Sequence, residues 1–138
     1  MAAVNIADVI ANLQSKWLAL PEVQAAPAQA PESLTVFPFA VTYERSGVLQ
    51  LRSHGWAQIL PNVLFSELHI GRALLPQAIA LAQSLRDPFL KAIMADPQLG
   101  NFVDTTQNIS WDFGRLEWGQ AQTIGYRFTI PMKTSLTL

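Results

Sequence analysis

The chain contains two histidines, His54 and His69, and these are the residues best suited to metal binding or acid–base chemistry. A metal site needs further ligands at spacings that bring them together, such as the three- or four-residue spacing of a helix. Neither histidine has an Asp or Glu at that spacing, and both fall in segments predicted to be strands. We therefore expect polar contacts or exposed positions for both side chains, and no metal.

Patterns for nucleophilic and phosphate chemistry are also missing. The sequence has no G-x-S-x-G elbow and no G-x-G-x-x-G loop. Gly114 and Gly119 have the spacing of P-loop glycines, but Gln120 and Ala121 stand where Lys and Ser or Thr bind phosphate and magnesium. The absence of cysteine excludes disulfides, thiolate ligands and cysteine nucleophiles. We expect neither an enzyme nor a bound cofactor.

Composition sets the size and the class of the fold. The 138 residues suit one domain, predicted to cover residues 1–138, and the 50% hydrophobic share is enough for a real core. A net charge of −1 gives no basic field for phosphates, which argues against sequence-specific nucleic-acid binding. The start "MAAVNIADVI" lacks the basic head of a signal peptide, and no segment approaches the ~20 apolar residues that span a bilayer. We expect no membrane segment, and synthesis in the cytoplasm.

Helical periodicity occurs in two parts of the chain. Residues 5–20 carry apolar side chains at spacings of three and four, with Asn5 as a cap. A second helix is predicted over residues 75–86, and a third, shorter one begins at Pro88, so the two form a kinked pair. Prolines, alanines and glutamines make residues 21–33 an extended connector.

Period-two alternation predicts about five strands, at residues 36–43, 48–59, 63–70, 108–116 and 122–133. Residues 45–47 are predicted to form the first turn, and residues 60–62 to end the second strand. The expected order is therefore α-β-β-β-α-α-β-β. It describes a single α+β domain with a mixed or antiparallel sheet.

The last two strands form a hairpin with two different faces. Phe113 and Trp111 share parity on the first strand, and a core face is predicted for five residues of the second: Ile124, Tyr126, Phe128, Ile130 and Met132. A two-residue loop at 118–119 would pair Phe113 with Ile124, whereas a longer loop slides each pair by two. We prefer a four-residue loop, because Trp118 is poorly suited to positive φ.

Seven residues are candidates for contacts with other subunits. Asp112, Gly125 and Arg127 lie on the outer face of that hairpin, where Asp112 is placed to pair with Arg127 and glycine admits another backbone. Arg and Trp are enriched at interface centres. The first hairpin offers such residues near its tip: Arg45, Arg52, His54 and Trp56.

The chain resembles the tail terminator family of long-tailed bacteriophages. The likeness rests on the N-terminal helix, the proline-containing crossing, a meander opening with "FPFAVTYE", the central helices, and closing strands that end "IGYRFTIPMK". The resemblance implies a homo-hexameric ring in the virion neck, made in the host cytoplasm. It also implies two partners, the major tail tube protein and the head connector or stopper protein, with viral DNA passing through the ring.

Two other functions fit the same residues. A head-completion or stopper protein also forms rings at that junction, and no residue in this sequence separates it from a tail terminator. A small α+β ligand-binding module is a further alternative. Low surface charge and a high hydrophobic share suit a subunit with several buried faces, but they also suit an ordinary large core.

Overall fold

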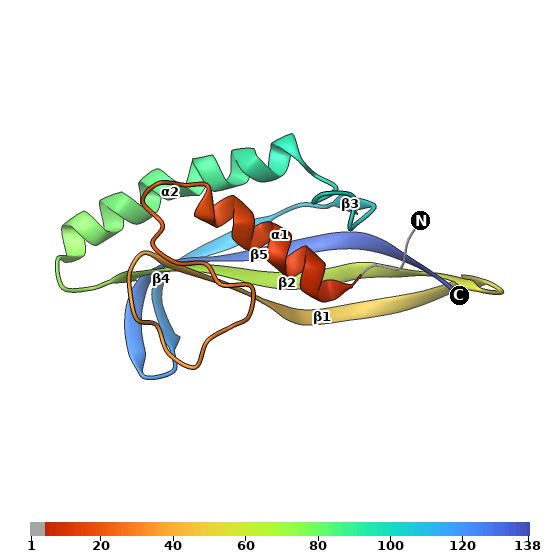
Figure 1. Ribbon diagram of the computed structural model, residues 1–138, viewed down its shortest axis with the longest axis horizontal. Coiled ribbons are helices and arrows are strands. Elements are labelled where there is room, and N and C mark those ends of the chain that lie inside the picture. The colour runs from red at the N-terminus through yellow and green to blue at the C-terminus, as the bar shows by residue number, and fades with distance from the viewer. Residues whose placement is uncertain (1–4) are drawn as a thin grey trace.

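Two helices lie against one face of an antiparallel sheet in the computed structural model, which describes residues 5–138 (Figure 1). The elements are α1 (Ile6–Leu18), β1 (Phe39–Ser53), β2 (Trp56–Gly71), α2 (Leu75–Ala95), β3 (Thr105–Thr106), β4 (Ser110–Trp118) and β5 (Ala121–Thr137). The sheet order is β1-β2-β5-β3, and β4 pairs with another part of β5. The predicted α+β class is confirmed.

Helix α1 forms where the periodicity predicted it. The Asn5 side chain accepts a hydrogen bond from the backbone N–H of Ala7, which caps the first turn. Val9, Leu13 and Trp17 lie along one stripe and are fully buried. The Trp17 ring stacks on Phe89 of α2 with 3.7 Å between centroids, and this contact joins the two helices above the sheet.

The first hairpin differs from the prediction. The turn expected at residues 45–47 is wrong, because these residues belong to β1. The pairing of β1 with β2 shifts by one residue between Glu44 and Ser46, as at a β-bulge, and then continues. The chain reverses instead at His54 and Gly55, where Gly55 has a φ of 76°. Two long strands therefore replace the three predicted ones.

Strand β2 continues through Pro61, where the sequence predicted an end. Proline lacks the N–H that a ladder needs, and the pairing of β2 with β5 is irregular between Ile59 and Asn62. Regular pairing resumes at Asn62 opposite Met132 and holds as far as Gly71. The irregular pairing at this point accommodates the missing N–H of Pro61. Pairing with β1 and β5 on either side keeps β2 extended.

The predicted kinked helix pair is one helix. Helix α2 continues without interruption through Pro88. Its buried residues keep a single stripe on both sides of the proline: Ala78, Ala82, Leu85, Phe89 and Ile93. Burial of this stripe against the sheet stabilises the helix on both sides of Pro88 along a single axis. The free energy gained by this burial outweighs the loss of the backbone hydrogen bond that proline removes.

The predicted core face of β5 is confirmed, since its apolar set from Ile124 to Met132 is buried. Phe113 pairs with Tyr126 and Trp111 with Phe128, so the parity was predicted correctly. These pairs are slid by two from Phe113–Ile124, as expected for the preferred longer loop, but the predicted loop length of four residues is wrong. Trp118 pairs with Ala121, which leaves Gly119 and Gln120 as the loop, and glycine rather than tryptophan takes the positive φ, 58°.

The turn of this hairpin holds the connector against the sheet. The indole Nε1 of Trp118 donates to the carbonyl oxygen of Pro31 at 2.7 Å. A Cβ added at Gly119 would lie 2.7 Å from the carbonyl oxygen of Glu32. Glycine is therefore needed at this position both for its backbone conformation and for the close approach of the connector.

Replacing Gly119 with alanine is expected to lower the free energy of unfolding by about 1–3 kcal/mol, because it adds a steric overlap to an unfavourable φ. Gly55→Ala is the matched control. Its φ of 76° is equally unfavourable, but an added Cβ would meet nothing closer than 3.9 Å. Chemical denaturation measures both, and faster proteolysis of the connector is expected only in Gly119→Ala. Equal losses in the two variants would show that the connector contact contributes nothing.

Candidate functional site

The seven predicted interface residues fall in two separate regions. Arg45, Arg52, His54 and Trp56 lie in the outer half of the β1–β2 hairpin. Asp112, Gly125 and Arg127 lie where β4 pairs with β5. The two regions lie at different places along β2, because Trp56 pairs with Thr137 whereas Glu67 pairs with Arg127. The structure therefore does not join them into one site.

The outer half of the first hairpin forms a β arm, which we define as residues 45–62 with residues 132–137 of β5. It extends beyond the two helices at one end of the sheet (Figure 1). Its apolar side chains include Leu49, Leu51, Ile59 and Leu136, and Leu51 is 82% exposed. A sheet face of this kind normally lies against a core or a partner.

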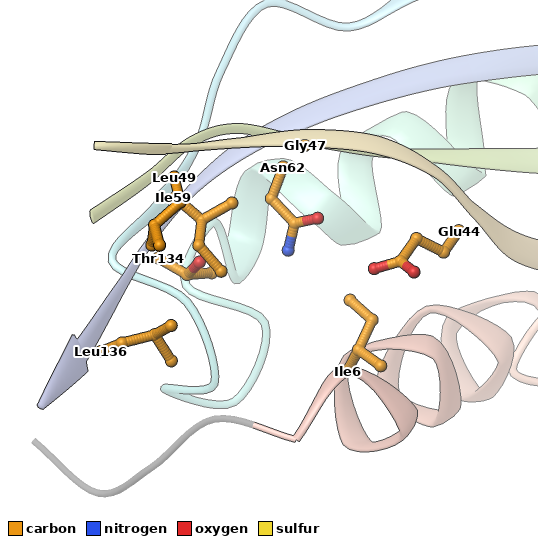
Figure 2. A pocket seen from close by; sticks show the side chains of 8 residues that line it. All are labelled: Ile6, Glu44, Gly47, Leu49, Ile59, Asn62, Thr134 and Leu136. Atoms are coloured by element: carbon orange, nitrogen blue, oxygen red, sulfur yellow. The ribbon is translucent and has the colours of Figure 1, made fainter. Parts of the chain in front are cut away.

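Two adjoining hollows lie on this part of the arm. One has a volume of 340 Å³ and lies between the arm and Ile6 at the start of α1 (Figure 2). The other, of 390 Å³, lies at the tip and is lined by Leu51, Trp56 and Leu138, among others. Together they form an open apolar groove along the arm.

Polar groups line the inner hollow of this groove. Figure 2 shows the Glu44 carboxylate and the Asn62 amide directed into it from the sheet. The Thr134 residue is 1% exposed, and its hydroxyl has no hydrogen-bond partner among residues 5–138. Burial of an unpaired hydroxyl costs free energy, so Thr134 is a polar group that the fold leaves without a partner among these residues.

The predicted arginines take different positions on the arm. The Arg45 guanidinium lies 5.1 Å from the centroid of the Phe65 ring. Arg52 donates from Nε to Oε1 of Gln58 at 3.1 Å. Strand alternation places Arg52 on the face opposite to Leu51. The arm is therefore amphipathic, with one apolar and one polar face.

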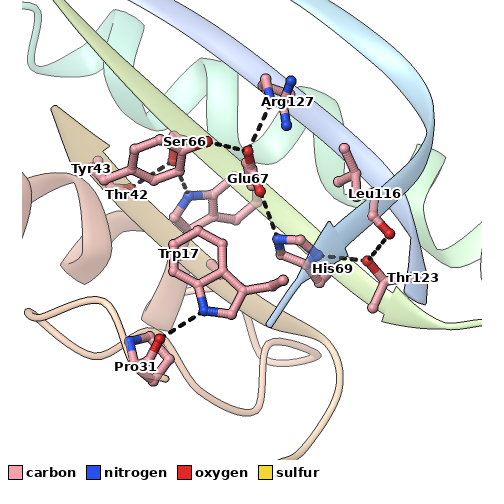
Figure 3. Close-up of polar contacts among 12 residues, drawn as sticks. Trp17, Pro31, Thr42, Tyr43, Ser66, Glu67, His69, Leu116, Thr123 and Arg127 are labelled. Carbon is pink, nitrogen blue, oxygen red and sulfur yellow. Dashed lines mark hydrogen bonds and ion pairs between the residues drawn. The ribbon is translucent and has the colours of Figure 1, made fainter. Parts of the chain in front are cut away.

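A buried polar network lies between β1, β2 and β5 (Figure 3). Glu67, 1% exposed, accepts hydrogen bonds from Tyr43, from Nε2 of His69 at 2.8 Å and from Nε of Arg127 at 2.7 Å. Nδ1 of His69 lies 2.6 Å from the hydroxyl of Thr123. Both ring nitrogens of His69 therefore have protein partners, and the polar-contact interpretation of this histidine is confirmed.

Burial by itself would raise the pKa of Glu67. Hydrogen bonds from His69, Tyr43 and Arg127 outweigh that effect and lower the pKa below its ordinary value. Burial and the adjacent carboxylate raise the pKa of the Tyr43 hydroxyl, which stays a donor. The network thus contains an ionised carboxylate with its donors in place, and it stabilises the junction of three strands.

Two expectations for the second region need correction. Gly125 was expected to admit a neighbouring subunit, but it is buried, and an added Cβ would lie 1.8 Å from the carbonyl oxygen of Leu68. The backbone that approaches it is therefore β2 of the same chain. Asp112 is opposite Arg127 in register as predicted, yet the ion pair of Arg127 is with Glu67. Arg127 consequently contributes to the fold.

Sequence reasoning missed the network and the groove for different reasons. Side-chain alternation along residues 63–70 puts Glu67 and His69 on one face of the strand, and this is the signal in the sequence for a polar cluster. Sequence alone did not show that both residues are buried, with the Trp118 ring 6.1 Å from that of His69. The misplaced turn concealed the arm, and with it the groove.

Residues 5–138 contain no group of three His, Cys, Asp or Glu side chains that could hold a metal ion. No helix among them is long and apolar enough to cross a membrane.

Comparison with protein-family models and with curated proteins finds no match for this chain. The fold and the surface define a class nonetheless. It is a single-sheet α+β domain whose β arm carries an open apolar groove beyond the helical layer. Exposed apolar surfaces of this kind are typical of sites that contact another molecule.

Proposed function

We propose that the protein is a tail terminator of a long-tailed bacteriophage. Six copies form a ring that binds the last ring of the tail tube, stops its polymerisation and presents the opposite face to the head connector. The observation that carries this proposal is the β arm, whose leucines Leu49 and Leu51 are exposed. The family resemblance of the sequence supplies the particular assembly.

Exposure of the arm favours assembly over a free monomer. Leu49 is 55% and Leu51 82% exposed, on a long hairpin that departs from the core. Covering a leucine side chain stabilises by about 1.5–3 kcal/mol, so a partner on this face would add substantial free energy. The arm lies at one end of the subunit, and a contact of one end with a different surface of the next copy generates a ring when rotation closes.

The proposal predicts a defined mass and a defined effect on the tail tube. Six copies of 15.2 kDa make about 91 kDa, expected by native mass spectrometry either for the free protein or after addition of tube rings. Added to polymerising tail tube protein, it is expected to shorten the tubes and to appear at one tube end in electron micrographs. A ring that binds the head connector but not the tube would instead identify a stopper. A monomer that ignores both would contradict the proposal.

Reversing both arm arginines, in Arg45→Glu with Arg52→Glu, is expected to leave the melting temperature within a few degrees of the wild type, because both residues are exposed. Tube capping should fall at least about tenfold, since rim charges control association. Arg86→Glu with Lys91→Glu on α2 is the control with the same change in net charge. Equal capping by the two double variants would show that the arm arginines do not contribute to the interface.

A further inference from the structure

The sheet has two free edges. Among residues 5–138, β1 has β2 as its only neighbouring strand, and β4 has only β5. Every second residue of an edge strand directs its backbone N–H and C=O groups away from the sheet, where they can pair with a strand of another chain. Residues 44–49 of β1 and residues 110–113 of β4 are all exposed. Both edges are therefore accessible to a second molecule.

The chain closes only the beginning of the β1 edge. Ala40 donates from its backbone N–H to the carbonyl oxygen of Ala25 at 2.9 Å, and its own carbonyl oxygen accepts from Nε2 of Gln14 at 2.9 Å. Beyond this point, no strand or bridge within the described part of the chain pairs with the outer side of residues 41–53. The open stretch of β1 therefore includes the whole first strand of the arm.

The direction of the strands determines how the edges of two copies meet. Neighbouring strands are antiparallel throughout the series β1, β2, β5, β4, so β1 and β4 run in opposite directions. A second copy that lies beside the first in the same orientation therefore presents its β4 antiparallel to β1. This arrangement continues the sheet from copy to copy, as a head-to-tail contact requires.

The charges on the two edges are complementary. On one face of the sheet, β1 carries Arg45, beside the Phe65 ring, and β4 carries Asp112. On the other face, β1 carries Glu44 and β4 carries Arg115. None of these four charged residues forms an ion pair within residues 5–138. Each face thus offers a cation on one edge and an anion on the other.

One register brings both charge pairs together. An antiparallel ladder can place Asp112 opposite Arg45. Arg115, three residues further along β4, then lies two residues from the position opposite Glu44 and on the same face. Such diagonal neighbours are within reach of long side chains.

Pairing of like edges is less favourable. Arg45 and Arg52 lie on the same face of β1, whereas Glu44, the one acidic residue of this strand, lies on the other. Two β1 edges would therefore bring like charges together, which is destabilising across strands. Asp112 is the one charged residue on that face of β4, so two β4 edges would repel there as well. The β1–β4 pairing places opposite charges together on both faces.

The two edges lie at different heights along the strands. Asp112 is level with Glu67 of β2. Arg45 follows Glu44, which is level with Leu64. A ladder that joins Asp112 to Arg45 thus shifts each copy along the strand direction relative to the previous one. A sheet that closes on itself requires a stagger of this kind.

We propose that β1 of one copy pairs with β4 of the next copy, in an antiparallel ladder in which Arg45 lies opposite Asp112. This inference rests on the proposed ring, and it names the contact between neighbouring subunits of that ring. The two regions of predicted interface residues lie apart in one chain, and the ladder joins them across two chains. The contact is heterologous, so it repeats from copy to copy until rotation closes.

Charge reversal tests the proposed pair. Asp112→Arg places two arginines together at each contact, and Arg45→Asp places two aspartates together. Each variant alone should assemble at least about tenfold less well than the wild type in native mass spectrometry, because like charges oppose association. An equimolar mixture should assemble again, since alternating copies of the two variants place opposite charges at every contact. A ring of six has the even number of copies that this alternation needs.

Arg52→Asp is the matched control, with the same change of charge on the same face of β1. It lies outside the proposed register and should gain nothing from mixing with Asp112→Arg. Mixing does not repair a misfolded subunit, so recovery in the first mixture also shows that both of its variants are folded. If that mixture assembles no better than either variant alone, the proposed pairing is wrong.

Cysteine cross-linking gives a second readout that leaves these charges intact. The natural chain has no cysteine. Ser46→Cys on β1 and Ser110→Cys on β4 replace exposed residues close to the proposed pair. When the two single variants are mixed and treated with a short bis-maleimide, a dimer with one copy of each is expected. Ser84→Cys on α2, which is also exposed, is the control and should cross-link with neither.

The outcomes separate this inference from the proposed function. Six-membered rings that give no 46–110 cross-link would overturn the inference and leave the tail terminator proposal standing. A 46–110 cross-link in open or differently sized assemblies would support the inference and overturn the hexameric ring. Dominant 46–46 or 110–110 cross-links, or cross-links to position 84 at equal yield, would overturn the inference by identifying a symmetric or a non-specific contact.

Discussion

Replacing Phe128 with alanine is expected to lower the free energy of unfolding by about 3–5 kcal/mol. The Phe128 ring is completely buried and lies at the centre of an aromatic cluster. Ring centroids of Phe89, Tyr126 and Trp17 lie 5.2, 5.5 and 5.9 Å from it, on both helices and the sheet. Because these neighbours belong to three different elements, they cannot all move into the space that the missing ring leaves.

Phe113→Ala is the matched control for this prediction. Phe113 faces the same side of the sheet on the adjacent strand β4, but it is 40% exposed and lies at the margin of the core. Its removal should cost roughly half as much or less, because water can fill the space. Urea denaturation followed by tryptophan fluorescence measures both variants. Similar losses would mean that Phe128 is not the centre of the core.

Glu67→Gln is expected to cost about 2–3 kcal/mol, because hydrogen bonds to a charged acceptor are stronger than those to an amide. The natural carboxylate accepts from three donors, on Tyr43, His69 and Arg127. A glutamine side chain has one acceptor oxygen, and its NH₂ group would face a donor. Glu44→Gln, on the neighbouring strand and exposed, is the control and should change stability by less than about 0.5 kcal/mol.

The same residue predicts a pH dependence. The pKa of Glu67 is lower in the folded state than its ordinary value of 4.5, so its contribution is fully present above that pH. The contribution decreases as the pH falls below 4.5 and through the lower folded-state pKa. Stability of the wild type should thus decline more steeply over this range than that of Glu67→Gln.

The comparison of the two chains isolates Glu67 from other acidic groups. The pKa of Asp96 is also lowered, by hydrogen bonds from Lys16 and Gly100, so its protonation in acid reduces stability as well. This loss is the same in the wild type and in Glu67→Gln. Chemical denaturation from pH 6 to pH 3 gives the two slopes. Parallel curves would show that Glu67 binds its proton with the same affinity in the folded and the unfolded chain, and that the network does not stabilise its charge.

Local sequence patterns predicted those helices and strands whose tertiary contacts favour the same structure as the pattern. The stripe of Val9, Leu13 and Trp17 and the Asn5 cap act within one helix, so α1 was predictable to within two residues at its end. Alternation along β5 likewise assigned its buried face, because side-chain parity is a property of the strand alone. The α+β class follows from the same periodicities.

Only the tertiary structure decided features in which a distant segment overrides a local signal. Pro88 predicts a helix boundary, yet burial of the α2 stripe on both sides keeps one helix. Pro61 predicts a strand end, but pairing with β5 carries β2 past it. The partner of Arg127 is Glu67 rather than Asp112, because β2 brings a buried carboxylate within 2.7 Å.

The arm and its groove belong to this second group. Residues 45–47 have the composition of a turn, but β2 offers a longer ladder, and the reversal moves to Gly55, whose positive φ suits a turn. The extra length forms the arm, which extends beyond the helices (Figure 1), and its side chains Leu49 and Leu51 are exposed. The sequence by itself determined that these residues are apolar and alternate along a strand. Their exposure depends on where α1 and α2 end over the sheet, which is set by long-range packing that no local window contains.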